Sequence, residues 1–191
     1  MKTKLCLLIL LIVGLSVQLS ANPINGLLER IDKGASKKFV IEFKKGADDF
    51  FELDQKGTKV VVRGNNYVNI ATGINWYLKY YAGIQLSWNG MQAKLPQVLP
   101  PVSRKERHET SLSLRYDFNY CTYSYTMAFW DWERWEKEID WMALHGINLP
   151  LAAVGQECIW FNMLQKLGYS KDEINRFIAG PAFLAWWAMN N

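Results

Sequence analysis

The chain has 191 residues, of which 50% are hydrophobic and 14% aromatic, and its formal net charge is +4. This is enough apolar material for one good core or two small domains. Lys2 and Lys4 belong to a predicted leader; without them the net charge is +2, which gives no electrostatic case for nucleic acid binding. With two histidines and no Ser-His-Asp or G-x-S-x-G arrangement, the sequence also argues against a zinc enzyme or a serine hydrolase.

Residues 1–21 are predicted to be a secretory signal peptide. The two lysines precede the short apolar run Leu5–Val13, and small residues follow it, with cleavage expected between Ser16 and Ala21. The alternative is an uncleaved membrane anchor. The signal-peptide interpretation predicts an exported protein, periplasmic or extracellular, without stable membrane insertion after cleavage.

Residues 22–99 are predicted to form a small α/β domain. A short helix over Pro23–Lys33 precedes three β-type runs, at Phe39–Phe43, Phe50–Asp54 and Lys59–Arg63, the last two joined by a turn in which Gly57 can take positive φ. Apolar side chains at spacings of three and four predict a helix over Asn66–Tyr81.

Gly83 is placed to end that helix, and Ile84–Trp88 is predicted to be a further strand. Nothing in this domain is placed for catalysis, which favours a structural role. Three of the six prolines follow between Pro96 and Pro101, so residues 100–111 are predicted to be a linker. The charged run at 104–108 is interpreted as solvated linker rather than as a binding patch.

Residues 112–191 have the pattern of a βαβ series. A strand over Leu112–Phe118 ends in a polar corner at Asn119–Thr126, a helix is predicted over Asp131–His145 and ended by Gly146, and a buried strand over Ile147–Val154 follows. In folds built from such units, the chemistry lies at the carboxyl ends of the strands. Pro150 fits a central strand poorly, because it removes one ladder hydrogen bond.

Three further helices are predicted after this second strand. They cover Ile159–Leu167, a segment from a capping box at Ser170–Glu173 to Ile178, and Ala182–Met189. On the helix at Asp131–His145, one face is expected to hold Trp132, Trp135, Ile139, Met142 and Ala143. On the helix at Ile159–Leu167, the side chains expected to face inward are Trp160, Met163, Leu164 and Leu167. Two βα units cannot close a parallel barrel, so we expect either a partner chain or, preferably, the front part of a longer protein.

Several stretches resemble the α-N-acetylglucosaminidase family. They are Asn119-Tyr-Cys-Thr-Tyr-Ser-Tyr125, the tryptophan-rich segment Trp130–Leu149, Gly155-Gln-Glu157, Gly180-Pro-Ala-Phe-Leu-Ala-Trp186, and upstream Gly73–Tyr81 and Ser87-Trp-Asn-Gly90. The resemblance covers nearly everything after the leader. It implies a small amino-terminal α/β domain, then a (β/α)8 TIM-type barrel that is incomplete in this chain, then an all-helical domain.

The resemblance also implies an activity, the retaining hydrolysis of terminal α-linked N-acetylglucosamine. Such a reaction uses a nucleophile and a general acid/base, two carboxyl groups about 5 to 5.5 Å apart. In the family both are glutamates downstream of the matched segment, so no catalytic residue is assigned in this chain. The expected partner is a glycan ending in N-acetylglucosamine, with no cofactor and no metal; the oligomeric state stays open.

The resemblance carries Asn119, Cys121 and Trp186 over as residues of the sugar pocket. An amide can bond sugar hydroxyls, a thiol can fill space beside them, and an indole offers a flat wall to the pyranose face. The alternatives are that Asn119 caps a turn, Cys121 is core and Trp186 packs a helix.

Gln156, at the end of the second strand, is a fourth substrate-binding candidate. For Glu157, a structural role at a helix amino end is preferred, and Asp117 is interpreted as a member of a buried network. Cys121 and Cys158 are expected to be unpaired. A non-catalytic carbohydrate-binding or structural remnant is the alternative to an enzyme, and a protein-interaction module is a third possibility.

Overall fold

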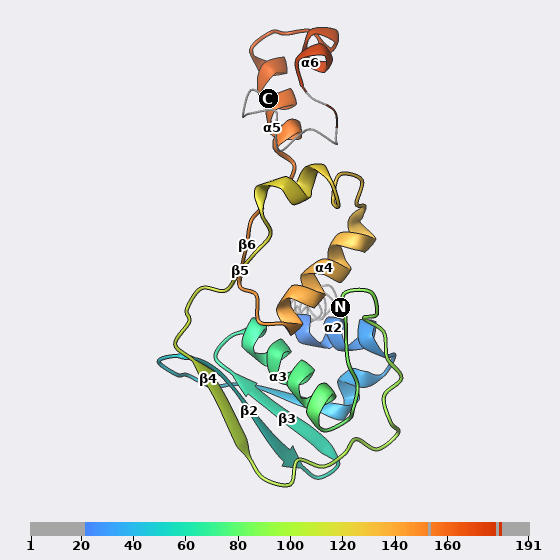
Figure 1. The fold of residues 1–191 in the computed structure, drawn as a ribbon, viewed down its shortest axis with the longest axis vertical. Coiled ribbons are helices and arrows are strands. Elements are labelled where there is room, and N and C mark those ends of the chain that lie inside the picture. The colour runs from blue at the N-terminus through green and yellow to red at the C-terminus, as the bar shows by residue number, and fades with distance from the viewer. Residues whose placement is uncertain (1–21, 153, 179, 181–191) are drawn as a thin grey trace, which may run out of the picture.

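The computed structural model describes residues 22–152, 154–178 and 180 of the chain (Figure 1). The predicted signal peptide and the predicted helix at 182–189 lie outside these ranges. Within them, no helix is both long enough and apolar enough to cross a membrane.

The first helix, α2 (Pro23–Ile31), begins at a capping residue. The side chain of Asn22 accepts a hydrogen bond from Ile24 N, and Pro23 occupies a first-turn position where its missing N–H costs nothing. Its apolar face is buried, as the spacing predicts. A 3-10 turn, η1 (Ala35–Lys38), connects it to the sheet.

A four-stranded sheet forms the base of the molecule (Figure 1). The strands are β1 (Phe39–Phe43), β2 (Asp49–Lys56), β3 (Lys59–Gly64) and β4 (Glu106–Thr110), in the order β1-β3-β2-β4. β1 runs parallel to β3, whereas β2 is antiparallel to both β3 and β4. Gly57 has φ +60° in the tight β2–β3 turn, which confirms the conformation expected there.

Strand β4 corrects the prediction of a linker over residues 100–111. Its charged side chains were interpreted as a solvated run, but Arg107 packs on β2. The Arg107 guanidinium lies 3.6 Å from the centre of the Phe50 ring and also bonds the carboxylate of Glu52. Lys44 and Lys105 bond the same carboxylate, which is almost completely buried. Burial raises the pKa of Glu52, but the three cations lower it more, to about 2.

Helix α3 (Tyr67–Tyr80) covers one face of the sheet (Figure 1). Asn66 caps its amino end, and Ile70, Ile74 and Tyr77 are fully buried along one stripe. A Cβ on Gly73 would lie 2.9 Å from Val62 Cγ1, so glycine permits the close approach of helix and sheet. The prediction of helix 66–81 is therefore confirmed to within a residue at each end.

The predicted strand at Ile84–Trp88 is wrong. Residues 84–86 have no regular secondary structure, and Ser87 and Trp88 begin a turn that is closed by a single bridge between Ser87 and Gly90. Leu86 is fully buried in the same core as α3, which accounts for the apolar character of the run. The buried Leu86 side chain and a hydrogen bond of 2.8 Å from Ile84 N to Leu78 O hold the segment, rather than pairing with a neighbouring strand.

The elements from α2 to β4 form the amino-terminal unit. The βαβ crossover lies above it in the view of Figure 1. Strand β5 (Tyr116–Asp117) leads through the 3-10 turn η2 (Tyr120–Ser124) and helix α4 (Trp132–Leu144) to β6 (Leu149–Pro150), which pairs with β5 in parallel. Both strands are far shorter than predicted. Leu149 is 42% exposed instead of buried on both faces, because each of the two strands has only one neighbour in the described part of the chain.

Helix α4 packs on α3 and α2 with a partly polar face. The predicted apolar face is confirmed at Met142, which is buried, and at Trp135 and Ala143, which pack on buried residues. Trp132 and Ile139 are exposed, whereas the carboxylates of Glu138 and Asp140 are buried. The guanidinium of Arg30 on α2 donates two hydrogen bonds, of 2.6 and 2.7 Å, to the carboxylate of Asp140. A buried acidic residue is tolerated when it is paired in this way.

Helices α5 (Gln156–Lys166) and α6 (Lys171–Phe177) pack on each other at the far end of the molecule (Figure 1). The capping box at Ser170 and Glu173 is confirmed. The prediction that α5 faces inward is wrong here, because no residue of α5 is buried and Leu167, just beyond its end, is 67% exposed.

Candidate functional site

The candidate site lies where β5 and β6 end. Because the two strands are parallel and Asp117 pairs with Pro150, their carboxyl ends lie at the same edge. Phe118, directly after β5, has φ +70° and is the only non-glycine residue with positive φ in the described ranges. The Asp117 carboxylate accepts a hydrogen bond of 2.8 Å from Phe118 N. Such a backbone costs about 1–3 kcal/mol, and strain of this kind gathers at functional corners.

Asn119 fixes the polar corner that follows. Its Oδ1 accepts hydrogen bonds from Cys121 N (2.9 Å) and Thr122 N (3.2 Å), and so caps η2. The turn-capping role considered from the sequence is therefore real. It does not exclude a binding role, because the residue is exposed and, among the described residues, its amide nitrogen donates to no group. The cap holds the amide in one orientation, with two donor hydrogens left for solvent or a ligand.

An aromatic cluster packs against this corner. Tyr123 and Met127 are buried, and Phe118, Trp135 and Leu151 pack against them. The Tyr123 hydroxyl donates a hydrogen bond to the carbonyl oxygen of Leu151, just after β6. The corner after β5 is thus bound to the segment that leaves β6.

Cys121 is half-buried in the corner, and Cys158 is exposed on α5; both are free. Gln156 is exposed at the start of α5, and no hydrogen bond joins it to Asn119 or Cys121 in the part of the chain described. Trp186 lies outside the described residues. The structure thus places three of the four candidates after the carboxyl ends of parallel strands without showing direct contact between the two loops.

Glu157 lies at a helix amino end, as preferred for it, whereas the interpretation of Asp117 as a member of a buried network stays a prediction. Glu157 lies in the first turn of α5, where a carboxylate is favoured by the helix dipole, and the cap residue Gly155 offers no side chain. Asp117 is half-buried and bonds the backbone of the strained residue beside it. Within the described ranges, no group of three or more His, Cys, Asp or Glu side chains is placed to hold a metal ion.

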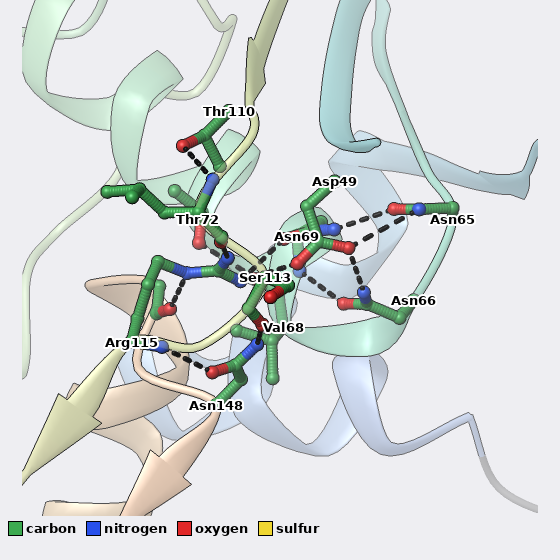
Figure 2. A network of polar contacts seen from close by, with 12 residues as sticks. Asp49, Asn65, Asn66, Val68, Asn69, Thr72, Thr110, Ser113, Arg115 and Asn148 are labelled. Carbon is green, nitrogen blue, oxygen red and sulfur yellow. Dashed lines mark hydrogen bonds and ion pairs between the residues drawn. The ribbon is translucent and has the colours of Figure 1, made fainter. Parts of the chain in front are cut away.

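A polar network centred on Arg115 holds the opposite, amino-terminal end of both strands (Figure 2). Its Nη2 bonds Asp49 at 2.8 Å and Asn69 at 3.3 Å, both from the amino-terminal unit. Its backbone N–H bonds the Asn148 side chain before β6, and its Nε donates to Gly146 O. Burial raises the pKa of Asp49, but the bonds from Arg115 and Asn69 outweigh it, so that the pKa is lowered.

Sequence reasoning missed this network and one further cluster. Trp88, Arg134 and Glu138 come together where the amino-terminal unit meets the start of α4. The i,i+4 spacing of Arg134 and Glu138 was a usable signal for their ion pair. Nothing in the sequence indicated that Trp88 would join it from 50 residues away.

A small α/β unit is followed by two parallel strands with an intervening helix and a polar corner at their carboxyl ends. This defines the class as an α/β protein with an amino-terminal unit and the βα repeat from which barrel folds are built. The family models of the alpha-N-acetylglucosaminidase (NAGLU) N-terminal domain and tim-barrel domain match residues 22–101 and 115–191, respectively. The chain belongs to the alpha-N-acetylglucosaminidase family of glycoside hydrolases.

Relatives support the same assignment. The chain is 44% identical over 160 residues to human alpha-N-acetylglucosaminidase, covering 84% of this chain and 22% of the relative. The Family 89 Glycoside Hydrolase from Clostridium perfringens in complex with 2-acetamido-1,2-dideoxynojirmycin superposes with a TM-score of 0.83 at 40% identity, over 89% of this chain and 20% of that one.

The same Clostridium perfringens enzyme, with two glutamate-to-glutamine substitutions and in complex with its substrate GlcNAc-alpha-1,4-galactose, gives a TM-score of 0.82 at 40% identity, with the same coverage. The chain thus spans about a fifth of the length of the relatives it matches. The fold predicted from the resemblance, an α/β unit and the first part of a barrel, is confirmed.

Proposed function

We propose that the protein carrying these residues hydrolyses terminal α-linked N-acetylglucosamine, with retention of configuration at the anomeric carbon. The observation that carries the proposal is the capped corner Asn119–Ser124 after a parallel barrel strand, in a chain 44% identical to a human alpha-N-acetylglucosaminidase. A related enzyme binds GlcNAc-alpha-1,4-galactose as its substrate, which supports the same glycan class here.

In this proposal the corner binds the sugar rather than cleaving it. The Asn119 oxygen is occupied by the η2 cap, so its NH2 group donates to a sugar hydroxyl or to the acetamido carbonyl. Cys121 closes the pocket beside it with a small side chain that competes weakly for hydrogen bonds. Gln156 contributes a second amide from the loop after β6, and Trp186 a flat apolar wall.

We assign the nucleophile and the general acid/base to glutamates beyond the matched residues. Within the described ranges, Asp117 bonds the Phe118 backbone and Glu157 lies in the first turn of α5, and neither forms a contact with a second carboxylate. Retention requires two carboxyl groups about 5 to 5.5 Å apart across the anomeric carbon. The 191 residues therefore supply one side of the pocket, and we expect them alone to release no sugar.

The test is hydrolysis of 4-nitrophenyl N-acetyl-α-D-glucosaminide by the full-length protein, by wild type and by two Asn119 variants. Asn119→Asp keeps the capping oxygen but loses the NH2 donor, whereas Asn119→Ala loses both. We expect both to raise KM by about tenfold, the cost of one or two unmade hydrogen bonds. Sugar binding without turnover by the wild type would establish the non-catalytic remnant instead, and turnover by residues 1–191 alone would contradict the assignment of the glutamates.

We also propose export, on the composition of residues 1–21. Amino-terminal sequencing of the mature protein from its host tests this directly. A mature end between residues 16 and 22 in the periplasm or the medium supports the proposal, and an intact Met1 in the cytoplasmic fraction refutes it.

A further inference from the structure

The turn Ser87–Gly90 projects one tryptophan from the amino-terminal unit toward the barrel. Two backbone hydrogen bonds of 3.0 Å, Ser87 N to Gly90 O and Gly90 N to Ser87 O, close the turn. Leu86, immediately before it, is fully buried in the core of that unit. Trp88 is therefore held by a rigid support rather than by a flexible loop.

The indole of Trp88 bonds a buried carboxylate on α4. Its Nε1 donates to Glu138 Oε2 at 2.6 Å, and Arg134 Nη2 donates to the same oxygen at 2.8 Å. Glu138 is only 2% exposed, so this oxygen depends on both donors for solvation. The Arg134 guanidinium also lies 4.7 Å from the ring centre of Trp88 and 3.9 Å from that of Trp130.

From Trp130 the contacts continue into the candidate sugar corner. Trp130 meets Trp135 edge-on, with ring centres 5.0 Å apart, and Trp135 stacks on Tyr123 at 6.3 Å. Tyr123 belongs to η2, the turn that Asn119 caps and that contains Cys121. A continuous series of packed groups thus joins the turn of the amino-terminal unit to the corner.

Several contacts join the units, among them the Arg30–Asp140 pair, and two of them hold opposite ends of the crossover. The Arg115 network lies at the amino-terminal ends of β5 and β6, which in a barrel is the end that supports stability. The Trp88 contact lies at the first turns of α4, directly after the corner that ends β5. The Arg115 network thus lies away from the candidate site, whereas the Trp88 contact holds the end where a ligand would bind.

We propose that Trp88 is a positioning residue for the sugar pocket: through Glu138, Arg134 and Trp130 it fixes the corner that contains Asn119 and Cys121. The accessory unit thereby sets the geometry of a pocket to which it contributes no contact of its own. The role assigned to the corner rests on the proposed function, but the mechanical link between Trp88 and the corner does not.

The test uses Cys121 as a reporter of the corner. The chain is alkylated with iodoacetamide, and the rates at Cys121 and at the exposed Cys158 are followed in the same molecule by mass spectrometry of their peptides. Trp88→Phe removes the indole donor, and Glu138→Gln is the second variant. Trp76→Phe is the matched control, because Trp76 packs on Phe51, Tyr80 and His108 of its own unit.

Each protein is measured at the same interval below its own melting temperature, so that a purely structural loss of stability does not raise the rate. We expect Trp88→Phe and Glu138→Gln to speed alkylation of Cys121 relative to Cys158 by about three- to tenfold. Trp76→Phe should leave the ratio unchanged. An unchanged ratio in both test variants, or an equal rise in the control, overturns the proposal.

A second arm separates this inference from the proposed function. In the full-length protein, 2-acetamido-1,2-dideoxynojirmycin should slow alkylation of Cys121, and should do so less effectively in Trp88→Phe. If the variant accelerates alkylation but the ligand gives no protection, the mechanical link stands and the sugar-binding role of the corner is refuted.

Discussion

The amino-terminal unit and the barrel segment bury their apolar faces to very different extents. In α3, Ile70, Ile74 and Tyr77 are completely buried, whereas in α5 Ile159 is 71% and Trp160 39% exposed. The apolar spacing that predicts a helix is present in both regions. A pattern of this kind shows which face is apolar, but burial requires a partner element, and within the described residues α5 packs chiefly on the short helix α6.

The interface between the amino-terminal unit and the barrel segment differs from both interiors, because many of its contacts are polar. Three carboxylates accept hydrogen bonds across this interface: Asp49 from Arg115, Asp140 from Arg30, and Glu138 from Trp88. Charge-assisted hydrogen bonds are directional, so they fix orientation as well as proximity. The amino-terminal unit is thus attached to the barrel segment by contacts that fix the orientation of one relative to the other.

The comparison of burial is tested most strongly by a matched pair of isoleucines. Ile74→Ala on α3 should lower the free energy of unfolding by about 3–4 kcal/mol, since it leaves a cavity in a complete core. Ile159→Ala on α5 should change it by about 0.5 kcal/mol or less, because its side chain already contacts water. Urea unfolding followed by circular dichroism measures both, and equal losses would refute the contrast.

The polar interface is tested by Arg115→Met. The substitution leaves the carboxylate of Asp49, which is 17% exposed, without its cation and should cost about 3 kcal/mol. Lys137→Met is the control, because Lys137 and Glu133 form an exposed i,i+4 pair worth about 0.5 kcal/mol or less. The free energies of unfolding of both variants are measured by urea denaturation. Similar losses in the two would show that the Arg115 network contributes no more than a surface ion pair.

Acid should weaken the amino-terminal unit through Glu52. Its pKa is lowered from 4.5 to about 2 in the folded protein, so its stabilisation is complete above pH 4.5 and is lost as the pH falls toward 2. Glu52→Gln should cost about 2 kcal/mol at pH 7 and flatten this dependence. Unfolding free energies at pH 7, 4.5 and 3 measure the slope. An unchanged slope in the variant would assign the acid sensitivity to other carboxylates.

The smallest effect is expected at the corner itself. Asn119→Ala removes the cap of η2 and should cost about 1 kcal/mol, whereas Asn119→Asp keeps the capping oxygen and should cost less. Hydrogen exchange at the amides of Cys121 and Thr122 reports the cap locally. Equal exchange in the wild type and Asn119→Ala would mean that the cap does not order the corner.

Local patterns predicted the elements whose evidence lies within one segment. The α3 stripe, the Gly57 turn and the Ser170 capping box each follow from neighbouring residues, and the structure confirms them. The β4 strand was missed because its partner β2 lies more than 50 residues earlier. A charged run is interpreted as a linker when the strand with which it pairs is not known.

The candidate site was predictable in position but not in detail. The βαβ pattern and the family resemblance placed Asn119 and Cys121 after the first barrel strand, where the structure has them. The positive φ of Phe118 and the bond from Trp88 to Glu138 had no signal in the sequence, and the second joins residues 50 positions apart. Binding by the four predicted residues stays a prediction.

The most direct measurement is a crystal structure of the full-length protein with 2-acetamido-1,2-dideoxynojirmycin bound. We predict that the Asn119 amide nitrogen lies within hydrogen-bond distance of the ligand, that Cys121 borders it, and that two glutamates from the later part of the barrel flank its anomeric position. A ligand bound elsewhere, with the Asn119 corner facing solvent, would contradict the account.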